Sequence, residues 1–469
     1  GLCKKPANRG VVTFLDAYNI KDSGEIELKP LTILVGKNGS GKSSFLRLFP
    51  LLQQSFLSAK KGPLLWYRDK GVDFGDFSTT VRKGCEEIKI GFSVNCNKNV
   101  DQTYEVKFLI TIVSDKQEDG YDRIGHAQLS FLGNEISITY GENNEALVIV
   151  NNTLNYKMQY SDITYNLFPY LTFEREYKVP GFSELRNCLS DKGNYSRYYD
   201  YSDFLGISFN EFQNLLTDKE YGYNVINTYN SILLGYLSDF IMSVSMRLSY
   251  EIQSITYLGP FREAPQRYYR RQNLATSQIN MDGSNMAAFV NAMKDKSKFN
   301  SRLSDKYKIK LESESHFGQI SLFINKDGKR TNIIDTGFGY SQLMPVLLAL
   351  YMFDVTKSDS PFPFSDKADL LCVEQPELHL HPAMQYTLGE SFVDSASQIV
   401  NGRSYKKILL ETHSRSILDA IGNAVAENKI NVDDVAVYLF ETNNGIAEIT
   451  KSSFNDDGYL TNWPLGFLD

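Results

Sequence analysis

The sequence of 469 residues predicts an α/β fold that carries a β-rich insertion and a helical insertion. Three observations favour this fold. Near the start, an apolar strand runs into a glycine-rich loop and then an apolar helix. The middle of the chain changes to alternating apolar and polar residues, as in antiparallel strands. The last third returns to strands that alternate with helices, the rhythm of a parallel sheet with covering helices.

The composition is that of an ordinary globular protein, with 42% hydrophobic and 22% charged residues. The formal net charge is −7, so the chain has no overall basic field that would hold nucleic acid. Its five cysteines lack metal-ligand spacing, which predicts reduced thiols. No apolar run approaches the ~20 residues of a membrane span. We therefore expect a cytoplasmic protein without a membrane partner.

Residues 1–84 are expected to form the N-terminal half of the core. Residues 13–34 predict two strands around a turn, and apolar residues at helical spacing predict a helix over 43–56. Residues 85–180 predict an antiparallel β lobe with strands at 87–92, 104–112 and 135–140.

Residues 181–255 predict a helical insertion for dimerisation or sensing, since helical patterning runs over 204–258. Long heptad repeats are absent, so we expect no extended coiled coil. Residues 256–469 predict the C-terminal half of the core. Its expected strands are 319–325, 370–373, 407–410 and 435–440, and its expected helices are 341–353 and one after Pro382.

Residues 36–43 fit the phosphate-loop pattern G-x-x-x-x-G-K-[ST]. Glycines let the backbone wrap phosphates with its N–H groups pointing inward, and the following helix adds its dipole. Lys42 is expected to reach the β and γ phosphates of ATP and Ser43 to ligate Mg²⁺. A mere glycine-rich turn is the alternative. The expected nucleotide-binding residues are Gly36, Lys37, Asn38, Gly39, Ser40, Gly41, Lys42, Ser43 and Ser44.

Two later apolar strands end in polar residues. The strand 370–373 delivers Glu374 to the sheet edge where open α/β sheets bind ligands, so Glu374 is the expected second partner of Mg²⁺. The strand 408–410 is followed by Glu411, Thr412 and His413, and this histidine is expected to contact the γ-phosphate or to orient water. A solvated carboxylate and a structural histidine are the alternatives.

A fourth element is the loop at 335–342, which opens an apolar helix. Its amides and Ser341 predict an anion site at a helix N-terminus. Taken alone, this signal is weak. A fifth element is the tract 262–271, where arginines and tyrosines mix. It suits contact with phosphate, nucleic acid or a partner protein, or a structured loop with one nucleotide-contacting arginine.

These elements, in this order, resemble the ATP-binding-cassette ATPases of the SMC and OLD-like branch. The tract Glu-Gln-Pro-Glu-Leu-His-Leu-His-Pro at 374–382 looks like that of small OLD-like ATPases in bacterial antiphage systems, similar to the AriA ATPase of PARIS and the PtuA ATPase of Septu and retron systems. The resemblance implies an ABC-type P-loop ATPase head. It assigns Lys42 and Ser43 to Walker A, Glu374 to Walker B, Ser341 to the signature motif and His413 to the switch histidine.

One residue departs from that family's pattern. The position after the Walker B acid normally holds a glutamate that polarises water, but here it is Gln375. An amide cannot accept a proton as a general base. Either Glu377 or a histidine (His379 or His413) substitutes, or hydrolysis is slow. We favour slow hydrolysis, with Glu374, Gln375, Glu377 and His413 as the catalytic set.

The resemblance implies an ATP-dependent head-to-head dimer, or a higher oligomer, that regulates a separate effector. That effector is expected to be a nuclease, because too few residues follow His413 for the nuclease domain that follows the ATPase in OLD relatives. A phage-derived trigger or nucleic acid is the expected signal. The alternatives are a DNA-repair or chromosome-maintenance ATPase of the RecF and SMC type, and a transporter subunit.

Overall fold

The computed structural model describes residues 10–97, 103–115, 121–141, 143–161, 170–172, 225–271, 279–293, 295–355, 370–398 and 406–462. Most of the predicted helical insertion and the C-terminal tail after residue 462 lie outside these ranges.

The strands are β1 (Gly10–Ala17), β2 (Ile20–Asp22), β3 (Ile26–Leu28), β4 (Leu31–Gly36), β5 (Glu87–Asn97), β6 (Thr103–Ser114), β7 (Asp122–Phe131), β8 (Asn134–Tyr140), β9 (Glu145–Val150), β10 (Leu154–Ser161), β11 (Tyr170–Thr172), β12 (Ile255–Leu258), β13 (Tyr269–Arg270), β14 (Ile309–His316), β15 (Gln319–Lys326), β16 (Lys329–Asn332), β17 (Leu370–Glu374), β18 (Lys407–Glu411), β19 (Val435–Asn443) and β20 (Ile446–Ser452). The helices are α1 (Lys42–Phe56), α2 (Phe77–Thr80), α6 (Val225–Gly235), α7 (Leu237–Gln253), α8 (Met286–Ala292), α9 (Ser297–Tyr307), α10 (Phe338–Val355), α11 (Pro382–Ser397) and α12 (Arg415–Ala426), with 3-10 turns η1 (Ile333–Thr336) and η2 (Val432–Asp434).

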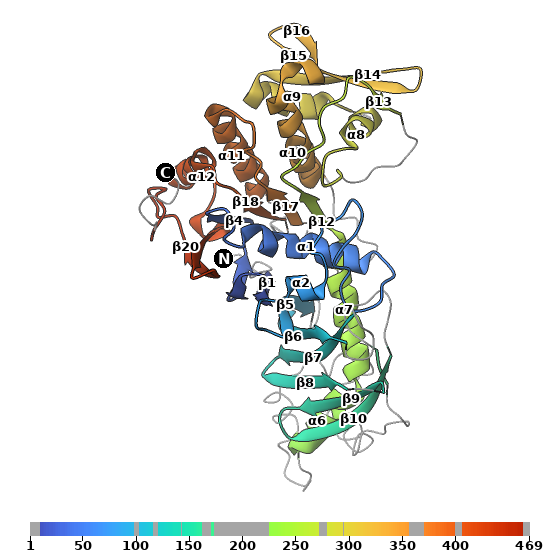
Figure 1. Cartoon of the computed structure of the whole chain (residues 1–469). Coiled ribbons are helices and arrows are strands. Elements are labelled where there is room, and N and C mark those ends of the chain that lie inside the picture. Colours follow the sequence, from blue (N-terminus) through green and yellow to red (C-terminus); the bar gives the residue numbers. More distant parts are fainter. Residues whose placement is uncertain are drawn as a thin grey trace, which may run out of the picture.

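One long sheet runs through the described part of the chain, in the order β11-β10-β9-β8-β7-β6-β5-β1-β2-β20-β19-β4-β18-β17-β12, with β3 beside β1 (Figure 1). Strands β19, β4, β18, β17 and β12 run parallel to one another and form the core. Strand β4, which leads into the phosphate loop, therefore pairs with β18, and β17 lies on the far side of β18. The expected split core, assembled from the two ends of the chain, is confirmed.

The parallel strands are buried on both faces, which explains their continuous apolar sequences. Leu34 and Leu409 belong to a core cluster shared with α1 and the β lobe. Ile33 and Leu410, their neighbours in the chain, belong to a second cluster shared with α10, α11 and α12. The sheet thus separates two hydrophobic cores, and the predicted helices over 43–56, over 341–353 and after Pro382 are confirmed.

The β lobe continues the core sheet, because β5 pairs with β1. Strands β5 to β11 are all antiparallel, as their alternation predicts, and α6 and α7 pack along them. The rings of Phe131 and Phe240 lie 4.6 Å apart in this contact. Two expectations are wrong: residues 13–34 lie in four strands rather than two, and 255–258 is strand β12 rather than helix.

A second, smaller sheet holds β13, β14, β15 and β16, all antiparallel, with α8 and α9 beside it (Figure 1, top). We call residues 266–336 the accessory lobe. The expectation that 319–325 belongs to the parallel sheet is wrong. The missed signal is turn chemistry, because Phe317-Gly318 and Asp327-Gly328 both close two-residue hairpins that must be antiparallel.

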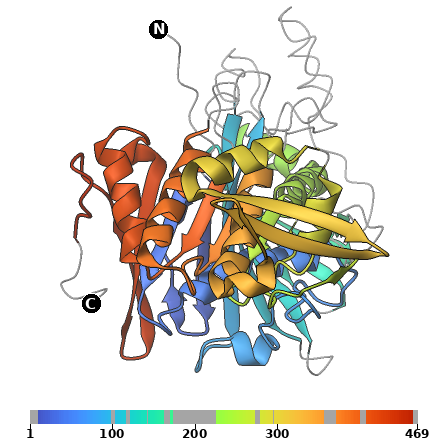
Figure 2. The same cartoon turned by 90° about the horizontal axis from the view of Figure 1, so that it is seen from above.

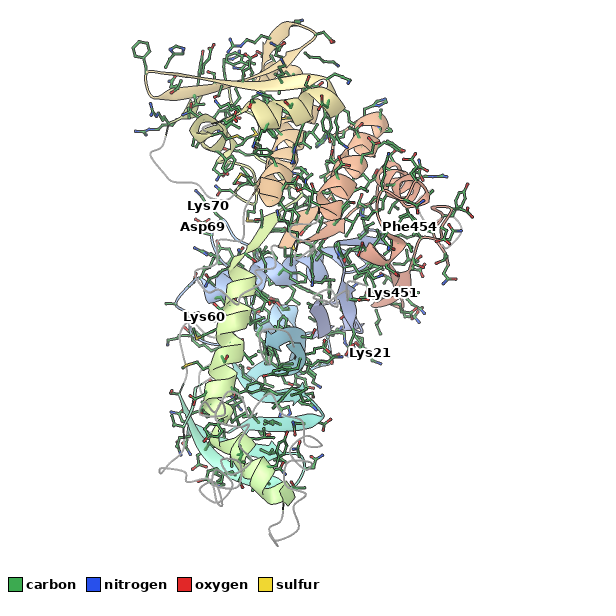
Figure 3. All side chains as sticks on the ribbon, turned by 180° about the vertical axis from the view of Figure 1, so that it is seen from behind. Lys21, Lys60, Asp69, Lys70, Lys451 and Phe454 are labelled. Atoms are coloured by element: carbon green, nitrogen blue, oxygen red, sulfur yellow. The ribbon has the colours of Figure 1, made fainter. Side chains whose placement is uncertain are left out.

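Strands β2 and β20 pair with each other and join the parallel strands to β1 and the β lobe. Lys21 on β2 and Lys451 on β20 are labelled in the rear view (Figure 3). Among the described residues no single helix is long and apolar enough to cross a membrane. Residues 229–235 and 237–253 meet that criterion only as a pair, bent by 55°.

Candidate nucleotide site

The phosphate loop lies between β4 and α1, as expected. Gly39 and Gly41 have φ angles of 75° and 99°, which glycine adopts without strain. Gly41 caps α1 and offers no side-chain acceptor, and the first turn of the helix carries no acid. The N–H groups and positive dipole end of α1 therefore remain available to an anion.

Lys42 is 3% exposed, and its Nζ donates to the carbonyl oxygen of Lys37 at 2.8 Å across the loop. Burial lowers the pKa of Lys42, and the negative charges of Glu411 and Glu377 oppose that effect. Its ammonium is thus held over the mouth of the loop beside two carboxylates. This is the position from which a lysine reaches the terminal phosphates.

Ser43 does not contact Glu374. Its Oγ donates instead to Oε1 of Glu411 at 2.8 Å. Glu411 is the last residue of β18 and is 1% exposed. Burial and the charge of Glu374 raise the pKa of Glu411 to about 7, while Lys42 and Ser43 lower it. A serine hydroxyl beside a carboxylate is the ligand chemistry that Mg²⁺ prefers.

Glu374 ends the neighbouring strand β17 and has both carboxylate oxygens occupied. Arg47 Nε and Nη2 donate to Oε1 and Oε2, each at 2.8 Å, and the Tyr257 hydroxyl donates to Oε1 at 2.7 Å. Burial alone would lower the pKa of Arg47, but the hydrogen bonds and charge of Glu374 raise it. The expected role of Glu374 at Mg²⁺ stays a prediction, with its carboxylate held by α1 and β12.

Glu377 and His413 contact each other at the ends of the loops after β17 and β18. The His413 backbone N–H donates to Oε1 of Glu377 at 2.6 Å. Burial raises the pKa of Glu377, and burial together with Lys42 lowers the pKa of His413 to about 4. The imidazole is therefore neutral near pH 7. Gln375 has a φ of 41°, and its N–H donates to the Glu411 carbonyl.

Arg262 lies beside these residues. It is 7% exposed, and its Nη2 donates to the carbonyl oxygen of Glu374 at 3.2 Å. Burial lowers the pKa of Arg262 to about 10, so it stays charged near neutrality. The other residues of the arginine–tyrosine tract lie elsewhere. Arg267, for example, pairs with Asp335 in the 3-10 turn η1 at 2.7 Å.

Several buried polar atoms around Lys42 have no hydrogen-bond partner among the described residues. They are Oε2 of Glu377, Oε2 of Glu411, Nε2 of His413, and Nε and Nη1 of Arg262. Buried polar groups are nearly always paired, and an unpaired one is costly. Both acceptors and donors converge here, which suits a ligand that brings phosphate oxygens together with a cation. The residues present therefore fit Mg²⁺-ATP.

An open cleft of about 730 Å³ adjoins the loop on the other side. Besides the phosphate loop, its lining includes the β19–β20 turn, Tyr18, Asn19, Arg82 and Lys83. Asn19 Nδ2 donates to the Gly39 carbonyl at 3.0 Å and so braces the loop. A cleft of this volume accepts a nucleoside.

The predicted Mg²⁺ ligands, Ser43 and Glu374, do not belong to a larger group of metal-binding side chains within the described part of the chain. No group of three or more His, Cys, Asp or Glu side chains in the described ranges is placed to hold a metal ion. Mg²⁺ bound with ATP takes one or two protein ligands and completes its shell with phosphate oxygens and water, so this finding is compatible with it.

Ser341 lies in the first turn of α10 and away from solvent. It is 2% exposed, and its Oγ donates to the Phe338 carbonyl at 2.8 Å. The exposed residues of this turn are Gly337 and Phe338, and the Phe338 ring lies 5.9 Å from that of His379. The loop after β17 and the start of α10 therefore form one surface.

A parallel sheet with a phosphate loop at one strand end and acidic residues at the next two defines a P-loop nucleoside triphosphatase. The chain belongs to the AAA ATPase domain family, whose sequence profile matches residues 19–418. It is an ATPase of this family. No curated protein matches its sequence.

Solved structures similar to the chain include the SMC head domain from Thermotoga maritima, with 10% identity, a TM-score of 0.38 and coverage of 95% of this chain and 98% of that one. The Smc head domain from Pyrococcus furiosus with an extended coiled coil, bound to the C-terminal domain of ScpA, has 10% identity, a TM-score of 0.39 and coverage of 96% and 97%.

Sequence reasoning missed Arg47, Tyr257 and Glu411, and left Arg262 as one alternative among several. Glu411 had a usable signal, because it ends an apolar strand just as Glu374 does. Arg47 had a weaker signal, four residues after Ser43 on the same helix face. Tyr257 had none, since its role depends on β12 pairing with β17.

Proposed function

We propose that this ATPase binds Mg²⁺-ATP between its phosphate loop and the ends of β17 and β18, and hydrolyses it slowly. The observation that carries the proposal is the set of buried, partnerless donors and acceptors around Lys42. Ser43 and Glu411 would hold Mg²⁺, which neutralises charge on the terminal phosphates. Arg262 and Lys42 would bind those phosphates as cations. Glu374 would support the site while held by Arg47.

Two residues decide the rate of hydrolysis in this proposal. Gln375 stands where a general base is usual and cannot accept a proton. Glu377 has one free buried oxygen beside the Lys42 charge, so it is the residue best placed to take a proton from water. We favour slow turnover, with ATP acting mainly as a clamp.

The first test is ATP binding and turnover by wild type, Lys42→Ala and Lys42→Arg. Loss of the ammonium should abolish measurable ATP binding at micromolar protein. Lys42→Arg is the control that keeps the positive charge. It should also bind ATP poorly, because a planar guanidinium cannot replace the compact ammonium inside the loop. Undiminished ATP binding by Lys42→Ala would place the nucleotide elsewhere.

The second test compares Gln375→Glu with Glu377→Gln. The first change should raise turnover and the second should lower it, by roughly 10²-fold if Glu377 is the general base. Wild-type turnover as fast as that of transporter-type ATPases, unaffected by Glu377→Gln, would contradict slow hydrolysis.

At the level of the cell, we propose that ATP holds two copies head to head, and that the assembly restrains or releases a separate effector, a nuclease, in antiphage defence. The motif 374–382 and the exposed Phe338 surface support this proposal. Light scattering with and without ATP tests self-association. A pull-down from cells that carry the neighbouring genes tests the effector. A protein that stays monomeric with and without nucleotide would contradict ATP-dependent dimerisation.

A DNA-repair or chromosome-maintenance ATPase is the second candidate. The chain's net charge of −7 speaks against general DNA binding, and the longest helix in the described ranges has 18 residues, too short for a coiled-coil arm. ATP turnover stimulated many-fold by duplex DNA would favour this candidate.

A further inference from the structure

Charge is divided very unevenly along the chain. The accessory lobe, residues 266–336, holds thirteen Lys and Arg against seven Asp and Glu, which gives +6. The remainder carries −13, since the total is −7. Such asymmetry between parts of one chain indicates that the basic part meets an acidic partner.

The β14–β15 hairpin of this lobe projects beyond the rest of the described structure (Figures 1 and 2). Its tip carries Phe317, whose side chain is fully exposed to solvent. Phe317 also has a φ of 46°, and Gly318 follows at 79°. Asn-Gly is the favoured pair for a hairpin turn with two positive φ angles, and a bulky residue there is strained. Folding alone therefore does not account for a phenylalanine.

Cations and a second aromatic group gather at the same tip. Arg270 pairs in register with Gln319 on β15, and the Arg271 backbone N–H donates to Gly318. Both arginines are exposed, and neither has an ion-pair partner within the described residues. Tyr268, one residue before β13, is 55% exposed. By contrast, Arg330 in the same lobe is engaged by Glu312 and Glu314.

We propose that the tip of the accessory lobe (Tyr268, Arg270, Arg271 and Phe317) binds single-stranded nucleic acid. The two arginines would contact successive phosphates and the two rings would stack on unpaired bases. Duplexes hide the faces of their bases, so exposed stacking rings favour a single strand. The site lies on a different sheet from the phosphate loop and needs no nucleotide.

Fluorescence anisotropy of labelled oligo(dT), oligo(U) and a matched duplex tests this assignment on the full chain at low salt. We expect both single strands, or one of them, to bind more tightly than the duplex. The double change Arg270→Glu with Arg271→Glu should weaken binding at least ~10-fold, and should reduce the salt slope by about 1.4 for two lost contacts on a single strand.

Phe317→Asn provides a variant that cannot fail by misfolding, because asparagine suits the turn better. It should weaken single-strand binding by roughly 5- to 150-fold while the melting temperature stays the same or rises. Lys157→Glu with Arg415→Glu is the matched control, since it makes the same charge change at exposed positions in the β lobe and α12. It should leave binding within about threefold.

Lys42→Ala should bind oligonucleotide as wild type does, which separates this proposal from the proposed ATPase role. No binding of either single strand at low salt would overturn it and leave a protein as the partner of the tip. Equal affinity for the duplex, with no effect of Phe317→Asn, would also overturn it.

Discussion

The ends of β17 and β18 have nearly the same local sequence but different roles. Each is an apolar strand that ends in a glutamate 1% exposed, and Glu374 and Glu411 are register partners. Glu374 is saturated by Arg47 and Tyr257, whereas Glu411 meets only Ser43 and keeps one oxygen free.

The difference comes from α1. Ser43 and Arg47 lie four residues apart on one face of that helix, so they reach the ends of adjacent strands. The first turn presents a small hydroxyl at the phosphate loop, and the second presents a guanidinium one turn deeper. A shared strand pattern therefore produces one structural carboxylate and one carboxylate open to a ligand.

The largest expected effect on stability comes from breaking the ion pair between Arg47 and Glu374. Arg47→Leu leaves Glu374 buried without its cation, so the free energy of unfolding should fall by about 3 kcal/mol or more. Urea unfolding at pH 7 measures it. The double change Arg47→Met with Glu374→Gln should recover most of the loss, because no buried charge remains. A single-variant loss below about 1 kcal/mol would show that Glu374 does not depend on Arg47.

The next effect tests the open carboxylate. Glu411→Gln keeps an acceptor for Ser43 and removes a buried charge, so the free energy of unfolding should change by less than about 1 kcal/mol. Mg²⁺-dependent ATP binding should weaken roughly 10- to 100-fold. ATP titrations in the presence of Mg²⁺ and in the presence of EDTA separate Mg²⁺-dependent from Mg²⁺-independent ATP binding. An equal loss in EDTA would mean that Glu411 serves the loop and not the metal.

A third effect concerns a buried carboxylate far from the site. Asp122 in β7 accepts from Trp66 Nε1 at 3.0 Å, and burial raises its pKa from 3.8 to about 6. Its folded pKa lies above its unfolded one, so stability is lost as pH rises between those values. At pH 7.5 Asp122→Asn should be more stable than wild type by about 3 kcal/mol, and near pH 3.5 the two should match. Urea midpoints at both pH values check this, and equal differences would contradict it.

Much of this architecture could be predicted from residues alone. The phosphate loop, α1, the antiparallel β lobe and the strands that carry Glu374 and Glu411 follow from local periodicity and turn chemistry. The accessory lobe was missed, because a strand such as β15 reads the same in a parallel or an antiparallel sheet. Its two-residue turns were the signal that distinguishes them.

By itself, the sequence determined that a phosphate loop precedes a helix and that two apolar strands end in acids, because these features depend on neighbours in the chain. Only the tertiary structure decided which acid meets Ser43, that Arg262 lies buried beside Glu374, and that Ser341 points inward. The Ser43–Glu411 and Arg262–Glu374 contacts join residues more than a hundred positions apart. They depend on strand order and helix rotation, which no local pattern encodes.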